Sequence, residues 1–586
     1  MNRTNRAGRR FGLPGRHWTY KYVALIAGLI AIARCWSIVG VYNHTTDELA
    51  HIAGAVGLYE SGRNVYMVEH PTLQRLVVGL ALRARGVEYP PARGLVEVQP
   101  RPDANVAGAD IVFDGRVGYW EVLKTARRAN LVFLALLLLF TYLLRAYLIN
   151  PLSGMLASVL IGIDPNILAH SALVTTDVPA AAGFLAASFF AIRFVARPTW
   201  PRAAAAGVAL GLAMSCKFTC VLLAPAVVVI IGIRAIRHAR GLTGGPPVPR
   251  GIMRRAWRHV PRMRYLVAIP VIAFVSLWAT YLFNIGRLQD QELFSAEKGW
   301  KAIPAVIKRT PMPMPSMPLG VMFMGAIGKT GFPCYFNGRL DFNGHLLYFP
   351  EALALKSATG GVIAAGLSVV ACAMAGRRRR RGLVALCLFL LPSFLMLAAM
   401  TGKLQIGIRH VLPVLPFIYL LIVLYLHRGR WVWALIALMG LCAVETARVH
   451  PDYLPFFNVL AGGPERGSRF LADSNLDWGQ DVARLADYLK TTGRRDYTIK
   501  VSGVQVARLV QWLGLDPKSR ETDIEALRQH PHGLLALGVN AKLGLEDFKK
   551  EKDGTVLHGP DYSWVARYPV IRRIGSSIEV YDLDAR

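Results

Sequence analysis

The sequence predicts a polytopic α-helical membrane protein with about eleven transmembrane helices and a small C-terminal α/β domain outside the membrane. Apolar residues make up 53% of the 586 residues, and the mean hydropathy is +0.35. These residues gather in runs of roughly 20, the length of helix that crosses about 30 Å of hydrocarbon. Basic residues concentrate in alternate connections between the runs, and the composition turns polar after residue 447.

Eleven apolar segments are predicted to span the membrane. The first exceeds a signal-peptide core and has no small-residue cleavage site after it, so we expect it to remain as an anchor. Six of the seven cysteines lie in spans and only Cys334 lies outside, so no disulfide framework is indicated. The predicted spans are residues 22–41, 127–148, 152–170, 176–195, 203–215, 218–233, 265–284, 354–376, 382–400, 411–426 and 431–447.

The placement of charge predicts the orientation of these spans. The net charge is +31, and a cytoplasmic N-terminus puts 26 of the 68 Lys and Arg residues, with no Asp or Glu, in the inner segments. This is the positive-inside pattern. The arginine run at 377–381 is therefore interpreted as an anchor on the anionic inner leaflet, and no nucleic-acid partner is expected. An odd number of crossings then places the C-terminus outside.

Three regions are predicted to lie outside. The loop 42–126 contains two apolar helices that would lie at the membrane interface, followed by an irregular stretch at 86–118 rich in Pro, Gly and Asp. The loop 285–350 is long and rich in Met, Pro and aromatic residues, which favours a functional lid.

The polar tail, 448–586, is predicted to fold as an α/β domain on the outer face. An amphipathic helix at 477–490, a strand at 497–503, a helix at 506–513, and strands at 533–539 and 576–583 follow from its patterns.

The acidic pair Asp47-Glu48 follows the first span in TTDELAHI. Thr45 and Glu48 fit a capping box, in which Glu48 reaches back to the Thr45 amide. That explanation leaves Asp47 without a structural role. On a helix, Asp47 and His51 share a face, and a carboxylate at the membrane edge could act as a general base.

Two further acidic positions have both structural and functional interpretations. Glu69-His70-Pro71 begins the second interfacial helix, where either polar residue could cap the helix or contact a phosphate, a metal or an acceptor. Asp177 lies at the outer start of the fourth span with Pro179 after it, which is typical of a helix start.

A set of basic residues lies at predicted outer turns, where the positive-inside rule disfavours cations. It consists of Lys217, Lys403, Arg409 and His410. Snorkelling or pairing with acidic residues would explain these cations, and so would gripping a lipid phosphate at the membrane surface.

These motifs resemble polyprenyl-phosphate-sugar-dependent membrane glycosyltransferases of glycosyltransferase family 39 and the wider GT-C superfamily. The similar elements, spread over most of residues 20–490, are TTDELAHI, EHPTLQRL, TTDVP, LAMSCKFT, GIRHVLPVLPF and the stretch that contains SNLDWGQD. The family includes protein O-mannosyltransferases and a bacterial aminoarabinose transferase that acts on lipid A.

The resemblance implies a GT-C fold for residues 22–447, a basic cytoplasmic tail at 1–21 and inverting sugar transfer. It places Asp47 at the proposed catalytic base and Asp177 at a second acidic position of the outer cavity. Glu69 matches a glutamate that the aminoarabinose transferase follows with Lys-Pro, whereas this chain has His70, a weaker phosphate ligand than lysine unless it is protonated.

The expected site therefore has three groups. Asp47, Glu48 and Asp177 are the catalytic candidates; Lys403, Arg409, His410, Lys217 and His70 are candidates for binding the donor phosphate; Glu69 and His51 are candidates for the acceptor or cavity. No cofactor or metal ligand set is assigned, and a divalent metal remains open.

The partners expected are a polyprenyl-phosphate-linked sugar donor, a protein or lipid acceptor and membrane lipids. The expected location is a bacterial inner membrane with the site outside the cytoplasm. A transporter or lipid flippase is the alternative, but the ionisable residues lie at the outer ends of spans and not at their middles. An interaction scaffold that acts through the tail is a third hypothesis.

Overall fold

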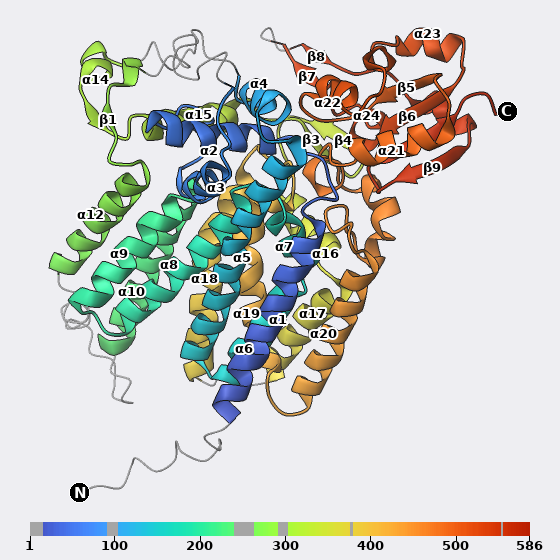
Figure 1. Cartoon of the computed structure of the whole chain (residues 1–586). Coiled ribbons are helices and arrows are strands. Elements are labelled where there is room, and N and C mark those ends of the chain that lie inside the picture. Colours follow the sequence, from blue (N-terminus) through green and yellow to red (C-terminus); the bar gives the residue numbers. More distant parts are fainter. Residues whose placement is uncertain are drawn as a thin grey trace, which may run out of the picture.

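The computed structural model describes residues 16–90, 103–239, 263–290, 303–374, 379–551 and 555–585. A bundle of long helices forms one layer, shorter helices lie across one end of it, and a sheet-containing domain lies beside them at the same end (Figure 1). The N-terminal tail before residue 16, the basic loop at 240–262 and part of the 377–381 arginine run lie outside the described residues.

Seven described helices are long and apolar enough to cross a membrane, and two bent helix pairs raise this number to nine. The bundle helices are α1 (Arg16–Ile38), α5 (Tyr119–Leu148), α6 (Pro151–Gly162), α7 (Pro165–Ser171), α8 (Asp177–Ala196), α9 (Trp200–Met214), α10 (Leu223–Ala239), α12 (Met263–Thr280), α16 (Tyr348–Lys356), α17 (Thr359–Met374), α18 (Arg379–Thr401), α19 (Leu415–Leu426) and α20 (Arg430–Arg448).

Helices occupy all eleven predicted spans, but several of them are short or bent. Helices α6 and α7 meet at 65°, and α16 and α17 meet at 115°. The segment 203–215 falls in α9, which has 15 residues, and 218–233 begins with the 3₁₀ helix η2 (Phe218–Leu222). The polytopic helical class is thus confirmed, with seven to nine candidate spans in the described residues rather than eleven.

The loop predicted at 42–126 contains helices α2 (Glu48–Ser61), α3 (Leu73–Ala84) and α4 (Ala104–Ala109), followed by a π turn at Asp110–Asp114. Most of α2 is buried under protein, so it does not lie exposed on a lipid surface. The expectation of an irregular 86–118 stretch is wrong for residues 104–114, which are helical, while residues 91–102 lie outside the described residues.

The loop predicted at 285–350 follows α12 and extends to the start of α16. Its described parts include η3 (Leu288–Asp290), α14 (Ala305–Arg309) and α15 (Ser316–Thr330), and residues 291–302 lie outside the described residues. Two short antiparallel ladders accompany them: β1 (Ile285–Gly286) with β2 (Met312–Pro313), and β3 (Cys334–Phe336) with β4 (Arg339–Asp341).

The C-terminal region contains a four-stranded sheet in the order β5-β6-β10-β9. Its elements include α21 (Val482–Thr492), β5 (Tyr497–Lys500), α22 (Val506–Trp512), α23 (Ile524–Gln529), β6 (Leu534–Gly538), α24 (Val539–Lys542), β9 (Val570–Ile574) and β10 (Ile578–Asp582). Strand β5 is parallel to β6, and β10 is antiparallel to β6 and β9. The predicted helices and strands of the tail are confirmed, whereas β9 was not predicted.

One hydrophobic cluster joins the C-terminal domain to the helices of the 42–126 loop. Leu49 and Ile52 of α2 belong to the same buried cluster as Leu485 of α21 and Leu509 of α22. The domain therefore shares a hydrophobic core with the helix that begins after Asp47.

Candidate functional site

Asp47 and Glu48 lie at the start of α2, but their carboxylates have different surroundings. Glu48 is fully buried, and its Oε2 accepts the Thr45 amide at 2.9 Å, as a capping box requires. Its Oε1 accepts the Val174 amide at 2.9 Å, and Arg127 donates Nε to Oε1 at 2.8 Å. These bonds hold the loop before α2 against α5, so Glu48 has the partners of a structural residue.

Burial opposes ionisation of Glu48, but its neighbours reverse that effect. Burial alone raises the pKa of this carboxyl; the Arg127 guanidinium and the backbone amides together lower it below its ordinary value. Glu48 is therefore an ionised, fully paired carboxylate with no exposed surface.

Asp47 lies at the open end of a chain of alternating charges. Arg409 Nη1 lies 2.6 Å from Asp47 Oδ2 and 4.0 Å from Asp177 Oδ2, and Lys217 Nζ donates to Asp177 Oδ1 at 2.8 Å. The Asp47 side chain is 22% exposed, whereas that of Asp177 is 3% exposed. A ligand that enters from solvent thus meets Asp47 before Asp177.

Four different elements supply these side chains. Asp47 precedes α2, Asp177 is the first residue of α8, Lys217 precedes η2, and Arg409 lies in η5 (Ile408–Val414) ahead of α19. Asp177 lies in the first turn of α8, as expected of a helix start, and its Oδ1 accepts a hydrogen bond from Lys217. Pairing with acidic residues accounts for both Lys217 and Arg409. Because both cations lie near the Asp177 carboxylate, a bound anion could contact the two together.

Neutral imidazoles surround this charged chain. The rings of His51 and His70 lie 5.0 Å apart, and His70 Nδ1 lies 3.3 Å from Thr176 Oγ1. Burial lowers the pKa of His51 to about 4 and that of His70 well below its ordinary value. Both imidazoles are therefore uncharged at neutral pH, which suits them to hydroxyl groups better than to a phosphate.

Two other histidines lie close to the Asp177 carboxylate. His170 and His410 both interact electrostatically with Asp177. The ring nitrogens His51 Nδ1, His170 Nδ1 and His410 Nε2 are buried and have no hydrogen-bond partner within the protein. These nitrogens give the site unused capacity to bind polar groups.

Helix α15 covers the loop that contains Glu69. A Cβ on Gly320 would lie 2.0 Å from the Val68 carbonyl oxygen, so only glycine permits this close approach. Burial raises the pKa of Glu69, and the nearby Asp47 carboxylate adds to the shift. Glu69 is thus a carboxyl near the charged chain, under the predicted lid loop.

Lys403 lies apart from the cluster of cations at Asp177. Its Nζ donates to the Lys329 carbonyl at 3.4 Å, at the C-terminal end of α15. Among the five residues expected to bind the donor phosphate, Arg409 lies at the Asp47 carboxylate, whereas Lys403 bonds to the backbone of α15.

Sequence reasoning assigned no role to several residues of this site. They are Arg127 beneath Glu48, His170 beside Asp177, and Ser474 and Trp478 beside Arg409. Arg127 opens a predicted span with a charge, which was an available signal. The SNLDWGQD stretch was recognised as a motif, but nothing in its spacing indicates contact with residue 409.

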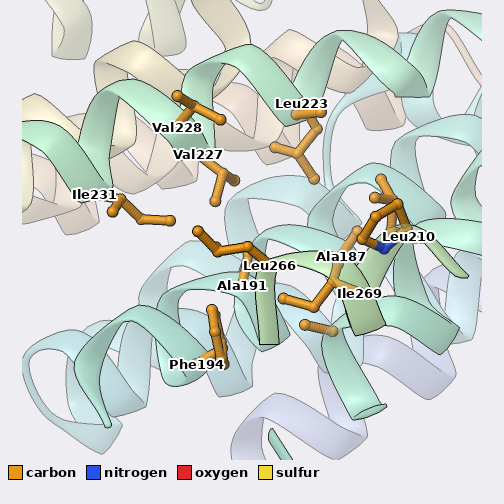
Figure 2. Close-up of a pocket in the computed structure, with 13 residues that line it drawn as sticks. Ala187, Ala191, Phe194, Leu210, Leu223, Val227, Val228, Ile231, Leu266 and Ile269 are labelled. Atoms are coloured by element: carbon orange, nitrogen blue, oxygen red, sulfur yellow. The ribbon is translucent and has the colours of Figure 1, made fainter. Parts of the chain in front are cut away.

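An apolar cavity lies between α8, α9, α10 and α12. Its volume is about 260 Å³, and side chains such as Phe194, Leu210 and Leu223 point into it from these helices (Figure 2). Leu210 and Leu223 flank Lys217 in the sequence, so the cavity begins on the two helices that Lys217 connects.

No metal-binding group was found in the described part of the chain. The described residues contain no group of three or more His, Cys, Asp or Glu side chains that could hold an ion. The seven cysteines are all unbridged.

Residues 24–284 match the family model of dolichyl-phosphate-mannose-protein mannosyltransferases. The chain resembles this family over that segment. The segment contains Asp47, Asp177 and Lys217, so the resemblance predicted from the motifs is confirmed there. A search of curated proteins found no significant match.

Several solved structures are similar to the whole chain at low identity. ArnT from Cupriavidus metallidurans bound to undecaprenyl phosphate is 11% identical, with 97% of this chain and 98% of that chain covered and a TM-score of 0.45. The apo form of the same protein is 12% identical, with 97% of this chain and 97% of that chain covered and a TM-score of 0.46. The oligosaccharyltransferase AglB from Archaeoglobus fulgidus, in complex with an inhibitory peptide and dolichol-phosphate, is 10% identical. The match covers 95% of this chain and 76% of that chain, with a TM-score of 0.43. Similarity at this level carries no conclusion about activity.

Proposed function

We propose that this protein is an inverting glycosyltransferase that moves a sugar from a polyprenyl-phosphate donor to an acceptor hydroxyl on the outer side of the membrane. The observation that supports this most is the Lys217–Asp177–Arg409–Asp47 chain of charges at the ends of membrane helices. The segment that holds three of these four residues matches the mannosyltransferase family. A bacterial inner membrane, with the site and the C-terminal domain outside, is part of the proposal.

Asp47 is the general base of the proposed reaction. It is the most exposed carboxylate of the chain of charges, and Arg409 holds its Oδ2 at 2.6 Å. An incoming donor phosphate competes with Asp47 for Arg409, which leaves the carboxylate free to take the proton of the acceptor hydroxyl. The hydroxyl oxygen attacks the anomeric carbon from the face opposite the phosphate, so the configuration inverts.

The leaving polyprenyl phosphate gains negative charge as the glycosidic bond breaks. Arg409 and Lys217 lie where they can hold that charge, since both already bind the Asp177 carboxylate between them. Asp177 fixes the two cations and takes no proton in this scheme. Glu48 receives no chemical step, because its oxygens are occupied by structural partners.

Uncharged groups would hold the sugar and the acceptor. The neutral imidazoles of His51 and His70 present hydrogen-bonding nitrogens next to the carboxylates. Glu69, on the loop under α15, is the proposed carboxyl contact for the acceptor. The acceptor is a protein or lipid hydroxyl.

The apolar cavity of Figure 2 is the proposed site of the isoprenoid chain. Its lining is almost wholly apolar, and it begins on the helices that flank Lys217. A phosphate held by Lys217 would leave the attached lipid pointing along α9 and α10.

Asp47→Asn tests the assignment of the base. Membranes containing the full chain would be given tritium-labelled dolichyl-phosphate mannose, the donor for which the matched family is named, and label transferred to protein or lipid would be counted. We expect a loss of about a hundredfold or more, since positioned general bases contribute 10²–10⁴-fold.

Asp103→Asn is the matched control, because Asp103 caps α4 through one oxygen that asparagine retains. Normal transfer by Asp47→Asn at equal expression would rule out Asp47 as the base. A flippase would be favoured instead if the wild-type chain moved polyprenyl-linked sugars intact between leaflets and released lipid phosphate from none of those tested.

A further inference from the structure

Residues 473–481, called here the bridge segment, connect the membrane helices to the C-terminal domain. The segment contains the 3₁₀ turn Asp473–Asn475, and most of its side chains are buried, with Trp478 3% exposed and Ser474 1% exposed. It makes contacts in three directions, and each leads to a different part of the candidate site.

The first set of contacts fixes Arg409. Ser474 Oγ accepts Arg409 Nε at 3.1 Å, and the guanidinium carbon lies 4.2 Å from the centre of the Trp478 ring. Asn475 Oδ1 accepts the Ile408 amide at 3.0 Å. With Asp47 at Nη1, the bridge segment therefore holds the guanidinium at Nε and across one face.

Gly407 permits this close approach. A Cβ at that position would lie 2.2 Å from Ser474 Oγ, and the residue has φ +154°. Ser474 Oγ also donates to the Ile406 carbonyl. The absence of a side chain at Gly407 thus leaves room for the Ser474 hydroxyl, which bonds both to the Ile406 carbonyl and to the Arg409 side chain.

The second set of contacts fixes the loop that ends at Asp47. The Trp478 carbonyl accepts the Thr46 amide at 3.1 Å, and the Gln480 carbonyl accepts the Asn43 amide at 3.2 Å. Asn43 Nδ2 donates to the Gly479 carbonyl at 2.7 Å. One short segment consequently sets the positions of both partners of the Asp47–Arg409 ion pair.

The third set of contacts joins the bridge segment to the sheet domain through Asn540. Asn540 follows β6 at the start of α24. Its Oδ1 accepts the Asp473 amide at 2.9 Å, and its Nδ2 donates to the Asp477 carbonyl at 2.8 Å. The domain therefore supports the bridge segment from behind.

We propose that Trp478 and Ser474 are positioning residues of the active site, and that the C-terminal domain supports catalysis through them. The inference rests on the proposed function for its kinetic part. Trp478 carries the Arg409 guanidinium on its face while its backbone carbonyl holds the loop of Asp47. A ligand phosphate thus meets a preorganised guanidinium rather than a mobile side chain.

The test compares Trp478→Leu with Trp478→Phe in the full chain. Leucine removes the aromatic face, and phenylalanine keeps one. We expect Trp478→Leu to lower kcat for transfer from dolichyl-phosphate mannose by about tenfold or more with KM changed by less than about threefold. Trp478→Phe should retain kcat within about threefold of the wild-type value.

Hydrogen–deuterium exchange provides a readout that does not depend on activity. Peptides covering 43–50 and 405–412 should exchange faster in Trp478→Leu than in the wild type, and at the wild-type rate in Trp478→Phe. Trp564→Leu is the matched control, because Trp564 is buried in the C-terminal domain among residues such as Tyr562 and Val565, in a different cluster from Trp478. It should leave both peptides unchanged.

Unchanged exchange and unchanged kcat in Trp478→Leu would overturn the proposal, as would equal loss in the leucine and phenylalanine variants. If Trp478→Leu fails to accumulate, Ser474→Ala is the variant that tests the proposal. We expect Ser474→Ala to show faster exchange at 405–412 and a lower kcat, and wild-type values of both would refute the proposal. A wild-type chain without transfer would refute the proposed function, while the exchange result would still decide whether the bridge segment holds both loops.

Discussion

At the scale of single residues, two adjacent carboxylates have opposite environments. Glu48 is fully enclosed by Arg127 and backbone amides, whereas Asp47 is 22% exposed and pairs with Arg409. A one-residue step along the chain at a helix start turns the side chain by about 100°. This geometry separates a structural carboxylate from one that can meet a ligand.

Glu48→Gln should destabilise the fold because it leaves the buried Arg127 guanidinium without its counter-ion. Removing one partner of a buried ion pair costs about 3–5 kcal/mol. We expect a lower midpoint of thermal unfolding in detergent and lower expression. Glu121→Gln is the control, since Glu121 pairs with Arg85 at the surface, where such pairs contribute about 0–1 kcal/mol. Wild-type stability with lost transfer would instead point to a chemical role for Glu48.

At the scale of elements, small residues let α9 lie against α12. A Cβ on Gly211 would lie 2.3 Å from the Ala273 carbonyl oxygen, and one on Gly207 would lie 2.9 Å from the Ile269 carbonyl oxygen. The two glycines are four residues apart on one face of α9. Since α9 leads to Lys217, the packing of α9 also fixes the position of that cation.

Gly211→Ala should therefore push α9 and α12 apart. We expect a lower midpoint of thermal unfolding and weaker transfer, because Lys217 moves away from Asp177. Gly232→Ala is the matched control on α10, where an added Cβ meets no atom within 4 Å. Equal stability of the two variants would mean that the α9–α12 contact relaxes without cost.

At the scale of the whole molecule, buried carboxyls link the two halves. Burial raises the pKa of Asp473 to about 6, that of Asp477 to about 7 and that of Asp481 to about 6. All three lie in the bridge segment between the helices and the sheet. Their charged forms are disfavoured in the folded state, so the junction of the halves is sensitive to pH.

The stability that these three carboxyls contribute should fall as pH rises through this range. A carboxyl whose folded pKa is raised contributes stability that is complete below about pH 4 and is lost as the pH passes its folded pKa near 6 or 7. Buried neutral histidines such as His51 and His70 have lowered pKa values and the opposite pH dependence. The test therefore compares the wild type with a variant that lacks one of the three carboxyls, by following the midpoint of thermal unfolding with tryptophan fluorescence at about pH 5 and about pH 8.

Asp477→Asn should remove one of these contributions, because asparagine does not ionise. Relative to the wild type, the variant's unfolding midpoint should be higher at about pH 8 than at about pH 5. A difference between the two proteins that is the same at both pH values would contradict the raised pKa of Asp477.

Local patterns in the chain were sufficient to predict most of the helices and strands in their order. Apolar runs predicted the positions of the membrane helices, and short apolar or alternating runs predicted β5, β6 and β10, because burial in lipid or in a sheet selects apolar side chains. The Thr45–Glu48 capping box is equally local, and its bond is present. Strand β9 escaped prediction, since most of its residues are exposed and alternate weakly.

Which charged side chains pair with one another became apparent from the folded arrangement alone. Arg409 lies 362 positions from Asp47, whereas Lys403, only six positions from Arg409, turns to α15. The contact between Trp478 and Arg409 likewise joins residues from two domains. Contacts of this kind depend on how helices pack in three dimensions, and spacing along one chain carries no record of that.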